Sequence, residues 1–201
     1  MEIVQNVWAS IVEMNWIVMI SVLAAIAYVV LAARGNIWCW AFGIVSAILW
    51  AYAAVVFYDL YVDGILQVYY VGMGFYGWHQ WRGGGSKQKA LPIQQLKWRQ
   101  HFMLIALGSV LTLVVGYFFG TYTAAAATYL DAFTTVFSII TTVLVARKIL
   151  GNWLYWIVID MTYVYLYGIR GGYLYALLNV VYVLVAVVGY WNWLKKMKVE
   201  G

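Results

Sequence analysis

Charged residues, cysteine, proline and histidine are all scarce in this sequence. Its 201 residues include one cysteine, one proline and two histidines, and only 9% of them are charged. Soluble domains carry about 25% charged residues. A chain in which 66% of the residues are hydrophobic could not cover its apolar surface by folding in water. The composition therefore excludes a soluble protein and predicts an all-α integral membrane protein.

These scarcities also exclude several kinds of chemistry. The single cysteine, Cys39, can form neither an intramolecular disulfide nor a cysteine metal cluster. His79 and His101 lack the spacing of metal ligands, and the glycine run at residues 83–86 lacks the Gly-Lys-Ser/Thr ending of a phosphate loop. We therefore expect no metal, no cofactor and no nucleotide hydrolysis. The net charge of +5 comes from short loops and a tail, so it does not indicate a nucleic-acid partner.

Seven apolar stretches have about the 20 residues that cross the hydrocarbon core of a membrane. The first lacks the features of a cleaved signal peptide, so we expect it to remain as a span. The seven predicted spans are Trp16–Ala33, Ile37–Tyr58, Leu60–Trp81, Phe102–Phe119, Tyr122–Val145, Asn152–Ile169 and Tyr173–Leu194.

One long polar break divides these spans into two groups of three and a single helix. The break, residues 82–101, holds the only proline and five basic residues. We predict a first three-helix bundle at residues 1–81, a basic cytoplasmic linker at 82–101, a linking fourth helix at 102–120, and a second three-helix bundle with a basic cytoplasmic tail at 121–201. Because the odd fourth helix reverses the direction of the chain, the two bundles of this 3+1+3 plan would be parallel.

Basic residues are distributed unevenly between the two sides that these spans define. Eleven of the twelve fall on one side, Arg170 is the exception, and the acids Asp59 and Asp63 fall on the other side. Basic residues collect in cytoplasmic loops. The sequence therefore predicts a multi-pass membrane protein, in contact with lipid, with its N-terminus outside and its C-terminus in the cytoplasm.

The two predicted bundles repeat one another. Gln67 and Tyr70 recur as Asn179 and Tyr182, 112 positions later (179 − 67), as do Gly77 with Gly189 and Trp81 with Trp193. Nearer the start of each bundle, Asn36 and Trp40 recur as Asn152 and Trp156, 116 positions later (152 − 36). Such duplication is typical of transporters whose substrate binds between the repeats near the membrane midplane.

Trp153, Trp156 and Asp160 share one face of the sixth predicted span because they stand at positions i, i+3 and i+7. A carboxylate inside a span is costly, so it usually faces a cavity or a partner. Asp160 is therefore a candidate for substrate binding or for proton coupling. The alternative is a hydrogen bond to a neighbouring helix, through Tyr163 or a threonine of the fifth span.

Amide and aromatic residues at matching places in both bundles complete the candidate substrate site. Asn179 and Tyr182 share a face of the last span, and Gln67 and Tyr70 share the equivalent face of the third. Buried amides need hydrogen-bond partners. A neighbouring helix could supply them, or a substrate that carries hydroxyl or carboxamide groups.

Two more candidates, Trp40 and Trp50, lie on one face of the second span. The position there that matches Asp160 at a spacing of 116 is Ile44, so we expect the two bundles to hold different ends of one ligand. Trp193, near the cytoplasmic end of the last span, is interpreted as a residue of the interfacial aromatic belt.

Further polar residues have less certain roles in this interpretation. A polar stripe along the fifth span either lines a pathway or joins helices, and several tyrosines of the sixth span are interpreted as interfacial or packing residues. The stripe is Asp131, Thr135, Ser138 and Thr142, and the tyrosines are Tyr163, Tyr165 and Tyr167.

The pairs Trp153-x-x-Trp156 and Asn179-x-x-Tyr182, with the basic tail and the 3+1+3 plan, resemble the nicotinamide riboside transporters, the PnuC family of bacterial vitamin transporters. The resemblance covers about residues 16–196. It implies a protein of the bacterial cytoplasmic (inner) membrane, a bundle like that of the SWEET sugar transporters, and a homotrimer. It also implies facilitated diffusion of a vitamin that a cytoplasmic kinase then traps by phosphorylation. Relatives of similar pattern are assigned to thiamine or riboflavin.

Nicotinamide riboside fits the candidate residues. Tryptophan and tyrosine faces attract a cation such as its pyridinium ring, amides pair with its carboxamide or hydroxyls, and Asp160 can balance its charge. Thiamine, another flat aromatic cation, satisfies much of the same list. A proton- or sodium-coupled symporter using Asp160 is the alternative mechanism. An enzyme is disfavoured because one buried carboxylate without a histidine or cysteine partner supplies too few catalytic groups, and the internal repeat favours a transporter over a receptor.

Overall fold

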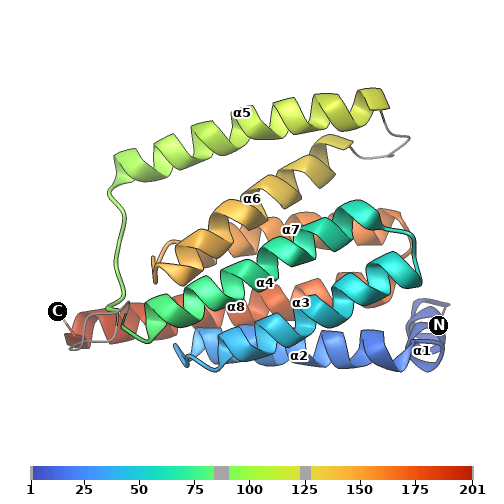
Figure 1. Ribbon diagram of the computed structural model, residues 1–201, viewed down its shortest axis with the longest axis horizontal. Helices are drawn as coiled ribbons and strands as arrows, with labels where there is room; N and C mark the ends of the chain where they lie inside the picture. The colour runs from blue at the N-terminus through green and yellow to red at the C-terminus, as the bar shows by residue number, and fades with distance from the viewer. Residues whose placement is uncertain (1, 84–90, 123–127, 201) are drawn as a thin grey trace.

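Every regular element of the described chain is helical, apart from one isolated bridge between Gln94 and Ile149. The computed structural model describes residues 2–83, 91–122 and 128–200, so part of the predicted linker lies outside the described residues. The predicted all-α class is confirmed. The helices are α1 (Glu2–Val12), α2 (Trp16–Ala33), α3 (Cys39–Val56), α4 (Tyr61–Trp81), α5 (Trp98–Tyr122), α6 (Thr128–Ala146), α7 (Asn152–Ile169) and α8 (Tyr173–Glu200) (Figure 1).

Five of these helices are long and apolar enough to cross a membrane, namely α2, α3, α5, α6 and α8. Helices α4 and α7 have the length for a span, but polar side chains such as Gln67 and Asp160 lower their hydropathy. The short helix α1 was not predicted. It lies across one end of the molecule and packs against α8 (Figure 1).

Helices α2, α4, α6 and α8 run toward one end of the molecule, and α3, α5 and α7 run toward the other (Figure 1). We call the first the basic end, because Arg34, Arg82 and Lys148 follow helices that finish there. We call the other the acidic end, after Asp59 and Asp63. The charge asymmetry expected from the sequence is thus an asymmetry between the two ends of the helices.

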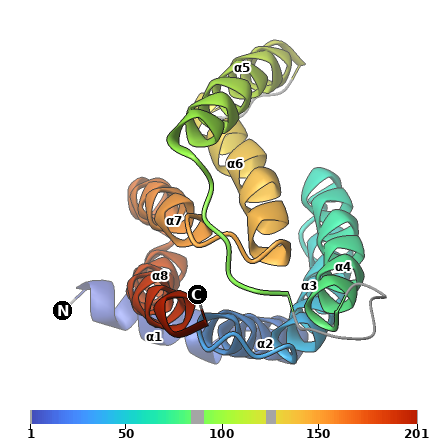
Figure 2. The same ribbon diagram turned by 90° about the vertical axis from the view of Figure 1, so that its left-hand side faces the viewer.

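Six helices form a closed ring. Neighbours around the ring are α2 and α3, α3 and α4, α4 and α6, α6 and α7, α7 and α8, and α8 and α2. Helix α5 lies outside the ring and packs along α6 (Figure 2). The ring consists of a first half, α2–α4, and a second half, α6–α8, which meet where α4 contacts α6 and where α8 contacts α2.

Four buried tryptophans join the two halves near the basic end, and we call them the tryptophan cluster. Trp40 packs edge-on against Trp81 with ring centroids 5.5 Å apart, and Trp153 packs edge-on against Trp193 at 5.4 Å. Trp81 and Trp193, one from each half, meet at 5.8 Å. Such edge-to-face pairs add to the stabilisation from burial.

Hydrogen bonds from the cluster cross between the halves in both directions. Trp81 Nε1 of α4 donates to the carbonyls of Val145 and Ala146 at the end of α6, at 3.3 and 3.1 Å. Trp193 Nε1 of α8 donates to the carbonyl of Ala32 at the end of α2, at 3.0 Å. Trp193 is fully buried, so its interpretation as an interfacial belt residue was wrong.

In the structure, the first two helices of one half do not match those of the other at the spacing of 116 residues expected from the sequence. A Cβ atom on Gly77 would lie 2.3 Å from the ring of Trp40, and one on Gly189 would lie 2.8 Å from the ring of Trp153. Each glycine therefore lets its helix approach one tryptophan ring closely, Gly77 at Trp40 and Gly189 at Trp153. Trp40 thus corresponds to Trp153, 113 positions later (153 − 40).

Backbone conformation gives the same register. Gly35 and Lys148, also 113 apart, both adopt positive φ, at 69° and 51°, and each is the second residue after the end of its helix, α2 or α6. The pairing of Trp40 with Trp156 was therefore wrong. The counterpart of Asp160 is Ala47 rather than Ile44, and since Ala47 is apolar and buried, the two halves still differ at the charged position.

Candidate substrate-binding site

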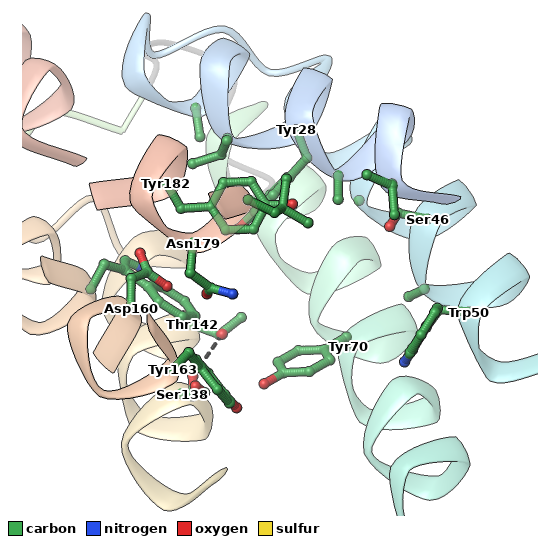
Figure 3. Close-up of a pocket in the computed structure, with 18 of the residues that line it drawn as sticks. Tyr28, Ser46, Trp50, Tyr70, Ser138, Thr142, Asp160, Tyr163, Asn179 and Tyr182 are labelled. Atoms are coloured by element: carbon green, nitrogen blue, oxygen red, sulfur yellow. Dashed lines mark hydrogen bonds between the residues drawn. The ribbon is translucent and has the colours of Figure 1, made fainter. Parts of the chain in front are cut away.

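A pocket of about 370 Å³ lies inside the ring and is lined by residues from all six helices. Its size is within the range of sites for small organic ligands. Part of it is shown in Figure 3. The structure brings together all the residues expected from the sequence to bind substrate, namely Trp40, Trp50, Gln67, Tyr70, Trp153, Trp156, Asp160, Asn179 and Tyr182.

Asp160 and Asn179 lie next to each other on the wall formed by α7 and α8 (Figure 3). Both are buried, and Asp160 makes no hydrogen bond to a described residue. Asn179 Nδ2 donates to the carbonyl of Tyr175 in its own helix at 2.8 Å, so its amide does not join two helices. The interhelical bonds left open as an alternative are absent from the described residues. Hydrogen-bonding capacity at both side chains is therefore available to a ligand.

The four candidate tryptophans differ in how they meet the pocket. Trp156 and Trp50 are half-buried and line it. Trp40 and Trp153 are only 2% and 1% exposed because they belong to the tryptophan cluster. Their Nε1 atoms have no acceptor among the described residues. Trp40 and Trp153 thus form the pocket boundary toward the basic end, whereas Trp156 and Trp50 offer ring surface to a ligand.

Asp63 lines the pocket, although the sequence indicated only that it lies on the outer side. Trp50 Nε1 of α3 donates to Asp63 Oδ2 of α4 at 2.8 Å. The signal in the sequence was its spacing: Asp63, Gln67 and Tyr70 stand at i, i+4 and i+7 and so share one helix face. Gln67 and Tyr70 on this face were expected from the sequence, but Asp63, which stands four residues before Gln67, was missed.

Several tyrosines also line the pocket. Tyr163 and Tyr167 were interpreted as interfacial or packing residues, but both face the pocket, where their rings stack at 5.9 Å. Tyr28 of α2 and Tyr175 of α8 were not expected there. Figure 3 shows Tyr28 beside Tyr182, and Tyr70 opposite Tyr163 across the pocket.

The polar stripe of α6 divides between two roles. Ser138 and Thr142 line the pocket, and Thr142 Oγ1 donates to the carbonyl of Ser138 at 2.8 Å (Figure 3). Asp131 instead forms an ion pair with Arg170 at the acidic end, at 2.7 Å. The two hydrogen bonds that the Arg170 guanidinium donates to the Asp131 carboxylate raise the pKa of Arg170. With side chains 39% and 35% exposed, the pair contributes little stability, but it neutralises the one basic residue at that end among those described.

The histidines show no sign of metal binding within the described part of the chain, where no three His, Cys, Asp or Glu residues gather. His101 has a packing role instead. Its ring stacks on Tyr155 of α7, and its Nδ1 lies 3.0 Å from the Tyr155 hydroxyl. This contact fixes the first turn of α5 against the second half.

Comparisons with known proteins give one consistent result. The sequence model of the family described as "Nicotinamide mononucleotide transporter" matches residues 15–195. The chain is 24% identical to "Nicotinamide riboside transporter PnuC" of Escherichia coli K12, over 94% of this chain and 89% of that protein. It is 29% identical to the protein of that name from Neisseria mucosa, over 92% and 74% of the two chains. A solved structure, "Crystal structure of the Vitamin B3 transporter PnuC", matches with a TM-score of 0.77 at 26% identity, over 99% of this chain and 89% of that one.

Proposed function

The chain belongs to the nicotinamide mononucleotide transporter family, and we propose that it is a uniporter that imports nicotinamide riboside by facilitated diffusion. The observation that carries this proposal is the pocket between the two halves of the ring, which combines aromatic ring surface, side-chain amides and a carboxylate. A cytoplasmic kinase that phosphorylates the imported molecule keeps its free concentration inside low and so maintains the inward gradient.

The chemistry of the pocket suits each part of nicotinamide riboside. The ring of Trp156 attracts the pyridinium cation, an interaction worth about 0.5–2 kcal/mol. Asn179 and Gln67 pair with the carboxamide and the ribose hydroxyls, because each amide both donates and accepts. Asp160, buried nearby, balances the positive charge of the ligand.

The arrangement of the helices supports a 3+1+3 plan with parallel repeats. Helix α5 crosses once between the halves, so α6–α8 run in the same directions as α2–α4 (Figure 1). Parallel repeats of this kind are related by an axis along the membrane normal, and alternating access arises when one repeat rocks against the other. The apolar outer face of α5, which includes Phe102, Leu113 and Tyr117, suits contact with lipid or with the other subunits of a homotrimer.

Transport by the purified protein in liposomes tests the mechanism directly. We expect nicotinamide riboside to move down its own gradient at zero membrane potential without ATP, sodium or a pH gradient, because Asp160 is the one acid in the middle of a span among the described residues. The measurement is uptake of radiolabelled ligand, with thiamine and riboflavin as competitors. Uptake that stops when the pH gradient is removed would favour the proton-coupled symporter instead.

The orientation is tested by labelling cysteines in intact cells. We propose that the basic end faces the cytoplasm, so Arg99→Cys at the start of α5 should resist an impermeant maleimide. Tyr61→Cys, at the acidic end and also exposed, is the matched control and should be labelled readily. Both changes are made with Cys39→Ala, although Cys39 is itself buried. Strong labelling at position 99 with none at position 61 would reverse the topology.

A further inference from the structure

The pocket has a second chemical environment at its acidic end. There the ring of Trp50 lies 6.5 Å from that of Tyr175, across the boundary between the halves, and the ring of Tyr175 lies 5.4 Å from that of Tyr167. The Asp63 carboxylate is held against Trp50 by the 2.8 Å hydrogen bond. We call these four residues the outer aromatic group. All four line the pocket and are half-buried, so they are accessible to a ligand.

The outer aromatic group is separated along the helix axes from the acid deeper in the pocket. Asp63 is the third residue of α4, at its outer end, whereas Asp160 is the ninth residue of the 18 in α7. At 1.5 Å per residue, Asp160 lies about 12 Å from either end of its helix. Figure 3 shows Trp50 and Asp160 on opposite sides of the pocket.

The two halves contribute their acids at different depths. In the register of the repeat, Asp63 corresponds to Tyr175, 112 positions later, and Asp160 corresponds to Ala47. Each carboxylate therefore has an uncharged counterpart in the other half, and the pocket carries one acid at its outer end and one in its middle.

The outer carboxylate remains available to a ligand. Only Oδ2 of Asp63 accepts the Trp50 hydrogen bond, and Oδ1 accepts none from a described residue. Arg170, the cation at this end among the described residues, is already paired with Asp131. The negative charge of Asp63 is therefore not cancelled within the described chain. Aromatic faces around a cation, with a carboxylate at the edge, form the kind of cage that binds organic cations.

We propose that Asp63, Trp50, Tyr167 and Tyr175 form an outer subsite that selects flat aromatic monocations as they enter, before the ligand reaches Asp160. This inference rests on the proposed transport of nicotinamide riboside for the identity of the cation. Asp63 supplies selectivity for charge at this subsite, and the three rings supply selectivity for a flat shape.

The test compares a cation with a neutral molecule of nearly the same shape. Nicotinamide riboside is a cation, and its dihydro form is neutral but keeps the carboxamide and the ribose. Binding of each to the full-length protein in detergent is measured by calorimetry for the wild type and for Asp63→Asn. We expect Asp63→Asn to bind the cation about threefold to thirtyfold more weakly and the neutral form within about twofold of the wild type.

Asp59→Asn is the matched control, because it removes the same charge at the same end from a residue that does not line the pocket. Asp59 has a positive φ of 54°, a conformation that asparagine also adopts readily. This variant should bind both ligands as the wild type does. If Asp63→Asn does not fold, Tyr175→Leu removes a ring of the same group and should also weaken binding of the cation selectively.

Each result decides the proposal. Equal losses for both ligands would show that Asp63 acts only by positioning Trp50, and unchanged binding of the cation would show that the subsite does not exist. The 1-methylnicotinamide cation, which is methylated on its ring nitrogen and lacks the ribose, separates the two proposals. If the wild type binds neither riboside but binds 1-methylnicotinamide in a manner that depends on Asp63, the subsite stands and the proposed transport function fails. If the binding of 1-methylnicotinamide is also independent of Asp63, the subsite is overturned.

Discussion

Replacing Trp156 with alanine should weaken binding of nicotinamide riboside by about 5- to 150-fold, or roughly 1–3 kcal/mol. Trp156 is half-buried and lines the pocket, so its ring is free to cover the ligand, and alanine removes both the contact area and the attraction for a cation. Calorimetric titration of the folded variant measures the effect. The loss should fall mainly on affinity, because Trp156 is not part of the buried tryptophan cluster.

The matched control is Leu154→Ala, two residues away on the same helix. Leu154 is 51% exposed and does not line the pocket, so this variant should bind the ligand as tightly as the wild type does. Wild-type affinity in Trp156→Ala, with normal folding, would show that the ligand does not contact this wall of the pocket.

Replacing Trp193 with alanine should lower the free energy of unfolding by about 3–5 kcal/mol, the usual cost of removing a large aromatic side chain from a packed core. The substitution leaves a cavity beside Trp81 and Trp153 and removes the hydrogen bond to Ala32. Unfolding of the detergent-solubilised protein by sodium dodecyl sulfate measures the change.

Trp191→Ala controls for the loss of any tryptophan from α8. Trp191 lies two residues earlier and is 56% exposed, so its loss should change the unfolding free energy by less than about 1 kcal/mol. Equal effects of the two substitutions would mean that the tryptophan cluster adds nothing beyond general hydrophobicity. A large effect of Trp193→Ala alone would support the cluster as the main contact between the halves.

The sequence predicts the helices well where hydrophobicity changes sharply at their ends. Predicted spans Trp16–Ala33 and Asn152–Ile169 have the same bounds as α2 and α7. Helix α8 begins at Tyr173 as expected but continues to Glu200 rather than ending at Leu194, because a charged tail can remain helical beyond the apolar region. Helix α1 was missed because it is amphipathic and too short to be a span.

The candidate site is predictable only as far as helical periodicity reaches. Periodicity places Asn179 and Tyr182 on one face, and the structure shows that this face lines the pocket. It does not distinguish Trp156, whose ring meets the pocket, from Trp153, which is buried. That difference depends on Trp193 of the neighbouring helix and on the close approach of Gly189, and such contacts between helices leave little trace in the sequence of either one.

The hydrogen bonds of the tryptophan cluster are reciprocal, since α4 donates to the end of α6 and α8 donates to the end of α2. Neither half alone supplies partners for the polar groups that it presents to the other half. Helices α2–α4 alone would leave the indole of Trp81 and the carbonyl of Ala32 without these hydrogen bonds. Two copies of one half, related by a two-fold axis, would satisfy both sets of contacts, as an isologous interface requires. The contacts between the two halves of this single chain are therefore of the kind that a two-fold symmetric dimer would make. The pocket departs from that symmetry, because its residues Asp63 and Asp160 have no acidic counterparts in the other half.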